Sequence, residues 1–203
     1  MFRATIINIF ENVWPMMLIV MTILISLRIA HVILNKTEVY LYKELLMLGF
    51  IIYIMCLFYV VTFQDVSWST SNFVPFKEMF RYEFGSRMFI KNVAGNMLMF
   101  MPYGFFISYF LKLKKPSAIF LLSLIVSLTI ETTQSLIGRV FDVDDIILNV
   151  LGAFIGFGIF YFLDRLRDSF PPILKKTWVY NIIITVIALI IVLTIAEILI
   201  TGV

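Results

Sequence analysis

Acidic and amide side chains recur at helical spacing in two apolar stretches of the sequence. Glu131 and Gln134 lie in the stretch SLTIETTQSLIG, and Asp145 and Asn149 lie in DDIILNVLG, which follows a short acidic loop. Residues three or four positions apart share one face of a helix. A carboxyl group among apolar residues can act as a general acid or base, and carboxylates with amides can bind a divalent cation or a polar headgroup. These two stretches are therefore the candidate functional site.

The composition indicates that the elements positioning these residues are membrane helices. The 203 residues are 62% hydrophobic and 14% charged, far from the average of soluble domains. Six apolar runs are each long enough to cross the hydrocarbon core at about 1.5 Å per residue. We expect the six spans at residues 14–34, 44–63, 93–111, 117–137, 146–163 and 178–200. The predicted fold class is all-α, an integral membrane bundle of about six transmembrane helices.

The predicted depth of Glu131 in the membrane makes this residue informative. It lies seven residues before Gly138, so it is placed about 10 Å below the end of its helix. An ionisable group at that depth costs a few kcal/mol unless it is paired or hydrated. We therefore expect Glu131 to face the bundle interior or a water-filled crevice. The sequence leaves two alternatives open, burial of Glu131 without a charged partner or pairing with an arginine, either Arg139 or Arg87.

The third span carries Asn96 together with Pro102 and Gly104. An asparagine in lipid needs a hydrogen-bond partner on another helix or contact with water. Pro102 removes a backbone hydrogen bond and is expected to kink the span. An alternative interpretation is that these residues only hold helices together and bend one of them.

The fifth span contains Gly152 and Gly156, a pair of small residues four positions apart. Such a pair lets another helix approach closely, and we expect that helix to be the third or fourth span. The approach would bring Asn149 beside Glu131 or Asn96. Asp142 or Asp144 is expected to cap the start of the fifth span, because carboxylates accept hydrogen bonds from a helix N-terminus.

The distribution of basic residues predicts the orientation. Ten Lys and Arg residues lie in the loops after the first, third and fifth spans or, for Arg28, near the adjoining end of the first span, against six in the other loops and the N-terminus. The more basic loops are expected on the cytoplasmic side. The acidic loop 138–145 and the segment 64–92 then lie on the external face.

The segment between the second and third spans is rich in aromatic residues. Phe76, Phe80 and Phe84 recur at every fourth position, and Pro75 suits a helix start. We therefore expect a short amphipathic helix in the outer membrane interface. It would serve either as a structural collar or as a lid over a site.

Several blocks of the sequence resemble the signature of the VanZ-like family of bacterial membrane proteins. They are NMLMFMPYG at 96–104, SLTIETTQ at 127–134 and RVFDVDDIILNVLG at 139–152, preceded by NFVPF at 72–76. The resemblance covers residues 64–162 and implies a link with resistance to teicoplanin-type glycopeptide antibiotics in Gram-positive bacteria. Carried over residue by residue, the family pattern corresponds to Asn96, Pro102, Gly104, Glu131, Gln134, Arg139, Asp142, Asp145, Asn149 and Gly152.

The resemblance and the hydropathy together divide the chain into three parts. Residues 1–63 hold two transmembrane helices, residues 64–163 form the VanZ-like core, and residues 164–203 contain a basic loop and the last transmembrane helix. The expected location is the bacterial cell membrane, with membrane lipids as partners. Nothing in the sequence points to nucleic acid.

Two functions remain open. The first is a non-enzymatic protein that binds a lipid, a lipid-linked cell-wall precursor or the lipid tail of a lipoglycopeptide in an outward-facing polar crevice. Its ligand-binding residues would be Asn96, Gln134, Arg139, Asp142, Asn149 and Arg87, and its structural residues Pro102, Gly104, Gly152 and Gly156.

The second function is a membrane-embedded hydrolase or transferase acting on a lipid-linked cell-wall substrate. Glu131 and Asp145 would be catalytic, and Glu131, Asp142 and Asp145 are candidate ligands of a divalent cation. The sequence leaves the metal and any cofactor open. The single His31 and the single Cys56 both lie within apolar runs away from the site, which argues against Ser-His-Asp or thiol chemistry.

Overall fold

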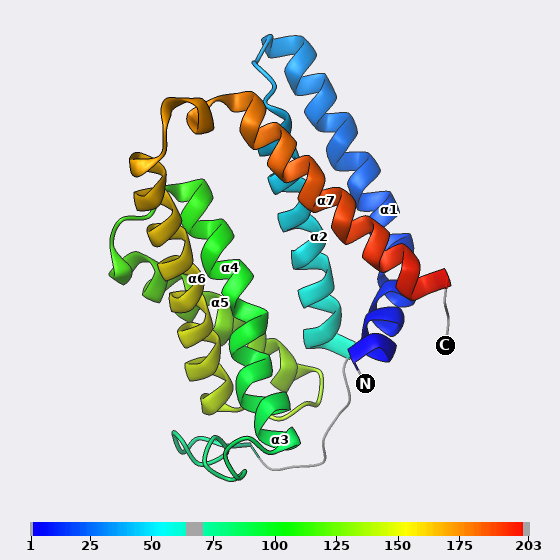
Figure 1. The fold of residues 1–203 in the computed structure, drawn as a ribbon. Helices are drawn as coiled ribbons and strands as arrows, with labels where there is room; N and C mark the ends of the chain where they lie inside the picture. The colour runs from blue at the N-terminus through cyan, green and yellow to red at the C-terminus, as the bar shows by residue number, and fades with distance from the viewer. Residues whose placement is uncertain (1, 64–70, 201–203) are drawn as a thin grey trace. The chain divides into compact units, whose positions relative to one another are not determined.

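The computed structural model describes residues 2–63 and 71–200, and most of them are helical. The helices are α1 (Phe2–Asn35), α2 (Leu41–Phe63), α3 (Arg87–Phe89), α4 (Gly95–Leu111), α5 (Pro116–Leu136), α6 (Val143–Ser169) and α7 (Thr177–Ile200) (Figure 1). A π-helical turn, Ile90–Ala94, joins α3 to α4, and a 3₁₀ turn, Pro172–Lys175, precedes α7.

Among the described residues, six helical stretches are long and apolar enough to cross a membrane. They overlap the six predicted spans, although the first begins earlier, at Ile7, and the fifth ends later, at Ser169. The third also begins earlier than expected, because α3 and the π-helical turn run directly into α4. The all-α fold is therefore confirmed. Within the described ranges the only bridge of β type is an isolated pair between Asn72 and Asp142.

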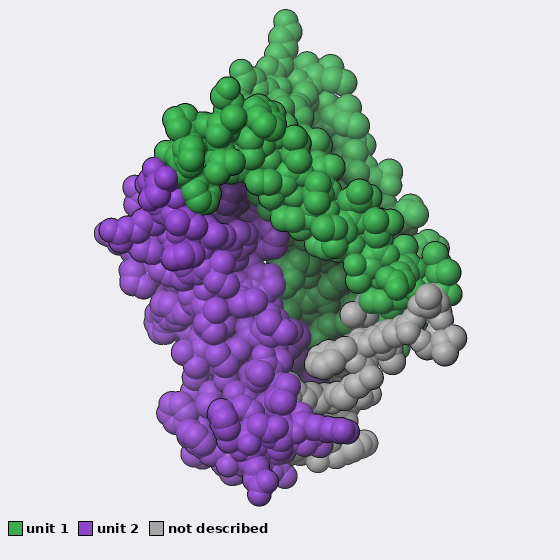
Figure 2. Space-filling view, in the orientation of Figure 1, with its two compact units in different colours: residues 1–60, 170–203 green, residues 61–169 purple. Residues whose placement is uncertain are grey.

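The chain divides into two compact units, coloured separately in Figure 2. Unit 1 contains α1, most of α2 and α7. Within it, Arg28 and Glu44 form a salt bridge of 2.6 Å, and the Tyr42 amide donates to Asn181 Oδ1 at 3.0 Å. Unit 2 spans residues 61–169 and contains the end of α2 with α3 to α6.

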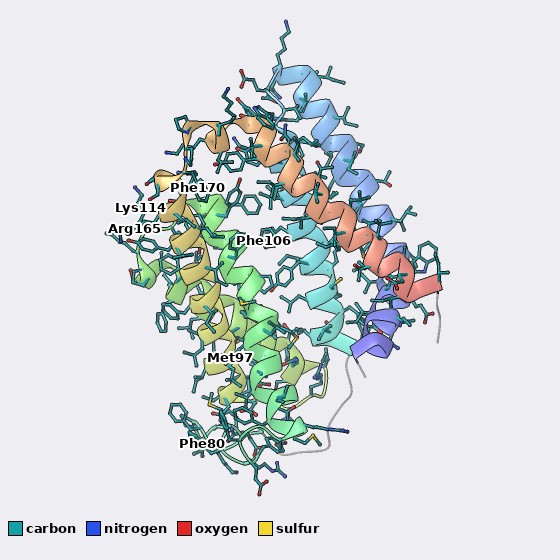
Figure 3. All side chains as sticks on the ribbon, in the orientation of Figure 1. Phe80, Met97, Phe106, Lys114, Arg165 and Phe170 are labelled. Atoms are coloured by element: carbon teal, nitrogen blue, oxygen red, sulfur yellow. The ribbon has the colours of Figure 1, made fainter. Side chains whose placement is uncertain are left out.

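The core of unit 2 is built on very close packing of α4 against α6. A Cβ atom added at Gly104 would lie 2.0 Å from the Ala153 carbonyl oxygen. Added at Gly152 or Gly156, it would lie 2.2 Å from Met97 O or 2.0 Å from Met101 O. Figure 3 labels Met97 on α4. The small-residue pair predicted an approach by the third or fourth span, and the structure shows that it is the third.

The amphipathic helix expected after Pro75 is not formed. Residues 74–85 make a series of turns, and Phe76 has a φ of +68°. The amide groups of Phe76 and Glu78 donate to the Asp144 carboxylate, which draws the backbone away from a helical path. The expectation for residues 64–70 of this segment lies outside the described residues.

Candidate functional site

Most of the predicted site residues lie at one end of unit 2, where α5 ends and α6 begins. We call this the acidic end, because it carries Glu131, Asp142, Asp144 and Asp145. The opposite end, called the basic end, carries Lys114 and Arg165, whereas Phe80 lies at the acidic end (Figure 3).

The end of α5 shows why the chain turns where it does. Gly138 has a φ of +84°, a left-handed conformation that glycine adopts without strain. The Arg139 amide donates to Gln134 O at 2.9 Å and the Gly138 amide donates to Ser135 O at 3.2 Å. These two bonds form a Schellman motif, which satisfies the last carbonyl groups of α5 and directs the chain into the acidic loop.

Asp142 caps α6 and joins it to the segment before α3. Its Oδ1 atom accepts from the Asp144 amide at 2.8 Å and from Asn72 Nδ2 at 2.9 Å. The Asn72 amide donates to Phe141 O at 2.8 Å, and the Val143 amide donates to Asn72 O at 3.1 Å. Asp142 therefore performs the capping role expected from the sequence.

Glu131 lies beneath this loop, with a side chain that is 2% exposed. Its Oε2 atom accepts a hydrogen bond from the Asp142 amide at 3.0 Å. A buried carboxyl group on α5 thereby holds the backbone at the start of α6. The expectation that Glu131 faces the bundle interior is confirmed.

Asp144 is as buried as Glu131, at 2% exposed, and makes more hydrogen bonds. Its two oxygens accept from the amides of Phe76 (2.5 Å), Glu78 (2.7 Å) and Met79 (3.0 Å). Its position in the first turn of α6 places it beside the positive end of the helix dipole. Of the two aspartates expected to cap the fifth span, Asp144 has a different role, because its carboxylate anchors the segment 76–79.

Two further pairs connect α6 with the other helices of the unit. Asn96 of α4 donates from Nδ2 to Asp145 Oδ1. One turn further along α6, Asn149 donates from Nδ2 to Ser127 Oγ of α5 at 3.0 Å. The asparagine side chains thus have partners on neighbouring helices, as asparagine in lipid requires.

The remaining candidates divide between the network and its surroundings. Gln134 Nε2 donates to the Val61 carbonyl oxygen at 3.0 Å, and Arg139 Nη1 donates to the same oxygen. Arg139 makes no salt bridge with any described carboxylate. Arg87 begins α3, is exposed, and has no ion pair or hydrogen bond with the acidic residues of this end among the described side chains.

The pKa of Asp142 in the acidic loop is set by its burial and by its hydrogen bonds. Burial raises the pKa of Asp142 above its ordinary range, and the hydrogen bonds from Asn72 and the Asp144 amide oppose that shift. In the described residues, no group of three or more His, Cys, Asp or Glu side chains is placed to hold a metal ion. A divalent cation at Glu131, Asp142 and Asp145 stays a sequence-based hypothesis.

Sequence reasoning underrated three residues that the network uses. Asn72 pairs with Asp142 through backbone and side chain, Asp144 holds the segment 76–79, and Ser127 receives the Asn149 amide. The signal for Ser127 was present, since it shares a helical face with Glu131. The partners of Asn72 and Asp144 lie between 65 and 70 residues away along the chain, and no local pattern reveals them.

The described residues define a helical protein with six candidate membrane spans and a polar cluster at one end of the helices of unit 2. A family model described as VanZ/LLP1 matches residues 50–164, which is more than half of the chain. The protein therefore belongs to the VanZ/LLP1 family, VanZ-like proteins associated with antibiotic resistance. Comparisons with curated proteins and with solved structures found no match.

Proposed function

We propose that this protein contributes to resistance against teicoplanin-type glycopeptides by binding a lipid or lipid-linked envelope component at the acidic end of unit 2. The observation that carries the proposal is the connected polar network. Buried Glu131 holds the Asp142 backbone, and Asp142 in turn holds Asn72. The buried members fix the arrangement, and the half-buried Asp142, Asp145 and Arg139 at its edge are the groups that a headgroup would reach.

The location of the network within the family match supports this proposal. The matched residues 50–164 include every member of the network. Arg139 lies on the loop beside it, and Arg87 is exposed at the start of α3, so two guanidinium groups are available for a phosphate. A lipid-linked precursor or the lipid tail of a lipoglycopeptide would also have its apolar part within the membrane.

We further propose that the acidic end faces the outside of a bacterial cell membrane. The support is the distribution of Lys and Arg over the loops of the whole chain, where ten accompany the first, third and fifth connections and six lie elsewhere. Lys112, Lys114 and Lys115 lie between α4 and α5, at the end where Arg165 also lies (Figure 3). Basic residues concentrate on the cytoplasmic side of membrane proteins.

The second candidate function, a membrane-embedded hydrolase or transferase, is favoured by one feature. Glu131 is an ionisable group enclosed in the bundle, the setting that general acids and bases use, and Asp142 and Asp145 lie on the adjacent loop and helix. Binding is preferred, because the Asp142 and Asp145 carboxylates accept hydrogen bonds from Asn72 and Asn96.

A comparison of two substitutions separates these functions. Cells expressing wild type, Glu131→Gln or Asn96→Leu are tested for teicoplanin and vancomycin susceptibility, and lipids retained by each purified protein are identified by native mass spectrometry. For a binding protein, Glu131→Gln keeps part of the protection, and Asn96→Leu loses both protection and lipid. For an enzyme, Glu131→Gln loses all protection and still retains lipid. No change in teicoplanin susceptibility on expression of wild type would refute the proposal.

A further inference from the structure

We propose that four phenylalanines at the acidic end anchor unit 2 in the headgroup region of the adjacent membrane leaflet. These residues, called the aromatic rim, are Phe73, Phe76, Phe80 and Phe84. The partner is a lipid surface. The proposal concerns residues outside the polar network and does not depend on which ligand that network binds.

The exposure of the rim is the first observation. The four side chains are 69%, 51%, 81% and 91% exposed, in chain order, and the neighbouring Val74 is 58% exposed. A phenylalanine side chain that faces water forgoes the favourable free energy of moving its apolar surface out of water. Figure 3 shows Phe80 at the acidic end, away from Lys114 and Arg165.

The backbone that carries the rim is held in place. The amides of Phe76, Glu78 and Met79 donate to Asp144, and Asn72 is bridged to Asp142. The segment therefore cannot turn its phenylalanines toward the helices without breaking hydrogen bonds to a buried carboxylate. These bonds explain why an apolar segment stays outside the core.

The level of the rim along the bundle is the third observation. The candidate span that includes α4 begins at Arg87, three residues after Phe84, and Asp144 lies in the first turn of α6. At the end of α5, Leu136 and Ile137 are likewise 82% and 48% exposed. The rim is thus level with the ends of three candidate spans, the depth at which interfacial segments place Trp, Phe and Leu side chains.

The charges between the phenylalanines fit the same partner. Lys77, Arg81 and Arg87 are exposed and alternate with the rim, and their long side chains can extend to headgroup phosphates. Arg81 also forms a 2.9 Å salt bridge with Glu78. This combination of apolar bodies and cations is typical of segments that lie in the membrane interface.

Spin-label accessibility measures the predicted immersion directly. The full chain is prepared with Cys56→Ser, which removes the single cysteine, and with one new cysteine at Phe80, Phe84 or Val74. Each labelled protein is reconstituted in vesicles of phosphatidylcholine and phosphatidylglycerol. Ile125→Cys, 53% exposed in the middle of α5, is the lipid control, and Lys114→Cys is the water control.

We expect the ratio of oxygen to nickel-reagent accessibility at Phe80 and Phe84 to be several-fold higher than at Lys114 and to approach that at Ile125. A ratio equal to that at Lys114 would overturn the proposal, since the rim would then face water. Val74 provides a third position if one label disturbs folding, judged by the unfolding temperature. A negative result here leaves the susceptibility test of the polar network unaffected, so the two failures are distinguishable.

Discussion

Alanine at Gly104 or Gly156 should strongly destabilise unit 2, although alanine favours helices. The new Cβ would lie 2.0 Å from a backbone carbonyl oxygen of the facing helix. An ordinary contact begins near 3.4 Å, so α4 and α6 must separate by the difference, 1.4 Å. A carbonyl oxygen cannot rotate away as a flexible side chain can, so the strain falls on the helix pair.

The magnitude follows from two opposing effects. Overpacking of a well-packed core costs about 1–3 kcal/mol, and contact with backbone belongs at the upper end of that range. Replacing glycine with alanine inside a helix contributes up to about 1 kcal/mol of stabilisation. We therefore expect a net loss of at least about 2 kcal/mol at either position.

Gly158→Ala, on α6 like Gly156, is the matched control. Its added Cβ meets nothing within 4 Å, so this variant should be neutral or more stable by up to about 1 kcal/mol. The assay is unfolding of the purified full-length protein in detergent, followed by circular dichroism. Equal stability of Gly104→Ala, Gly156→Ala and Gly158→Ala would refute the close approach of α4 and α6.

Three further outcomes are expected from the polar network. Asp144→Ala should raise trypsin cleavage at Lys77 by at least about tenfold, because even one hydrogen bond to a charged group contributes about 1.5 kcal/mol and three amides lose theirs. Asp142→Asn should remove a fall in stability with rising pH. Burial raises the pKa of Asp142 above the ordinary value of 3.8 that applies in the unfolded chain. The stabilising contribution of this side chain is therefore complete below pH 3.8 and is lost as the pH rises through the higher folded-state pKa. A double-mutant cycle of Ser127→Ala and Asn149→Ala should give a coupling energy of about 0.6 kcal/mol, and at most about 1.7.

Each of these outcomes has a control. Asp164→Ala removes a carboxylate that pairs with Arg167 at the basic end, and cleavage at Lys77 should not change. For Asp142, detergent unfolding of wild type and variant is compared across the pH range, and parallel curves would contradict the assignment. A coupling energy of zero would show that the bond between Ser127 and Asn149 does not stabilise the fold.

The six spans were predictable because lipid imposes a length and an apolar composition that are visible in any window of the sequence. A close approach of another helix to α6 was also foreseen, since Gly152 and Gly156 permit a backbone approach. The sequence left the choice between the third and fourth spans open. That choice depends on Gly104, whose missing side chain lets the Ala153 backbone of α6 pack against α4.

The segment before α3 was mispredicted for a physical reason. The spacing of Phe76, Phe80 and Phe84 has helical periodicity, but hydrogen bonds decide its conformation. Three backbone amides of this segment donate hydrogen bonds to the Asp144 carboxylate instead of to helix carbonyl groups. This acceptor lies 65 to 68 residues away in the chain. Local periodicity carries no information about such a distant acceptor.

The polar site itself was partly predictable. Glu131 and Asp145 were identified by the cost of placing carboxyl groups in apolar stretches, and Asn96 by the cost of an amide in lipid. Their partners were not identified, because hydrogen bonds between helices depend on register and rotation. The sequence offered Arg139 as a partner for Glu131, whereas Arg139 donates to the Val61 carbonyl oxygen.

The most direct test of the central claim is drug susceptibility at matched membrane levels. Cells express wild type, Glu131→Gln, Asp145→Asn or Asn149→Ala, with Ser135→Ala, an exposed position on α5, as the control. If the polar network is the functional site, teicoplanin-selective protection falls in all three network variants and is unchanged in the control, with vancomycin as the reference drug. Full protection in all three would contradict the account and would leave the buried polar residues with a purely structural role.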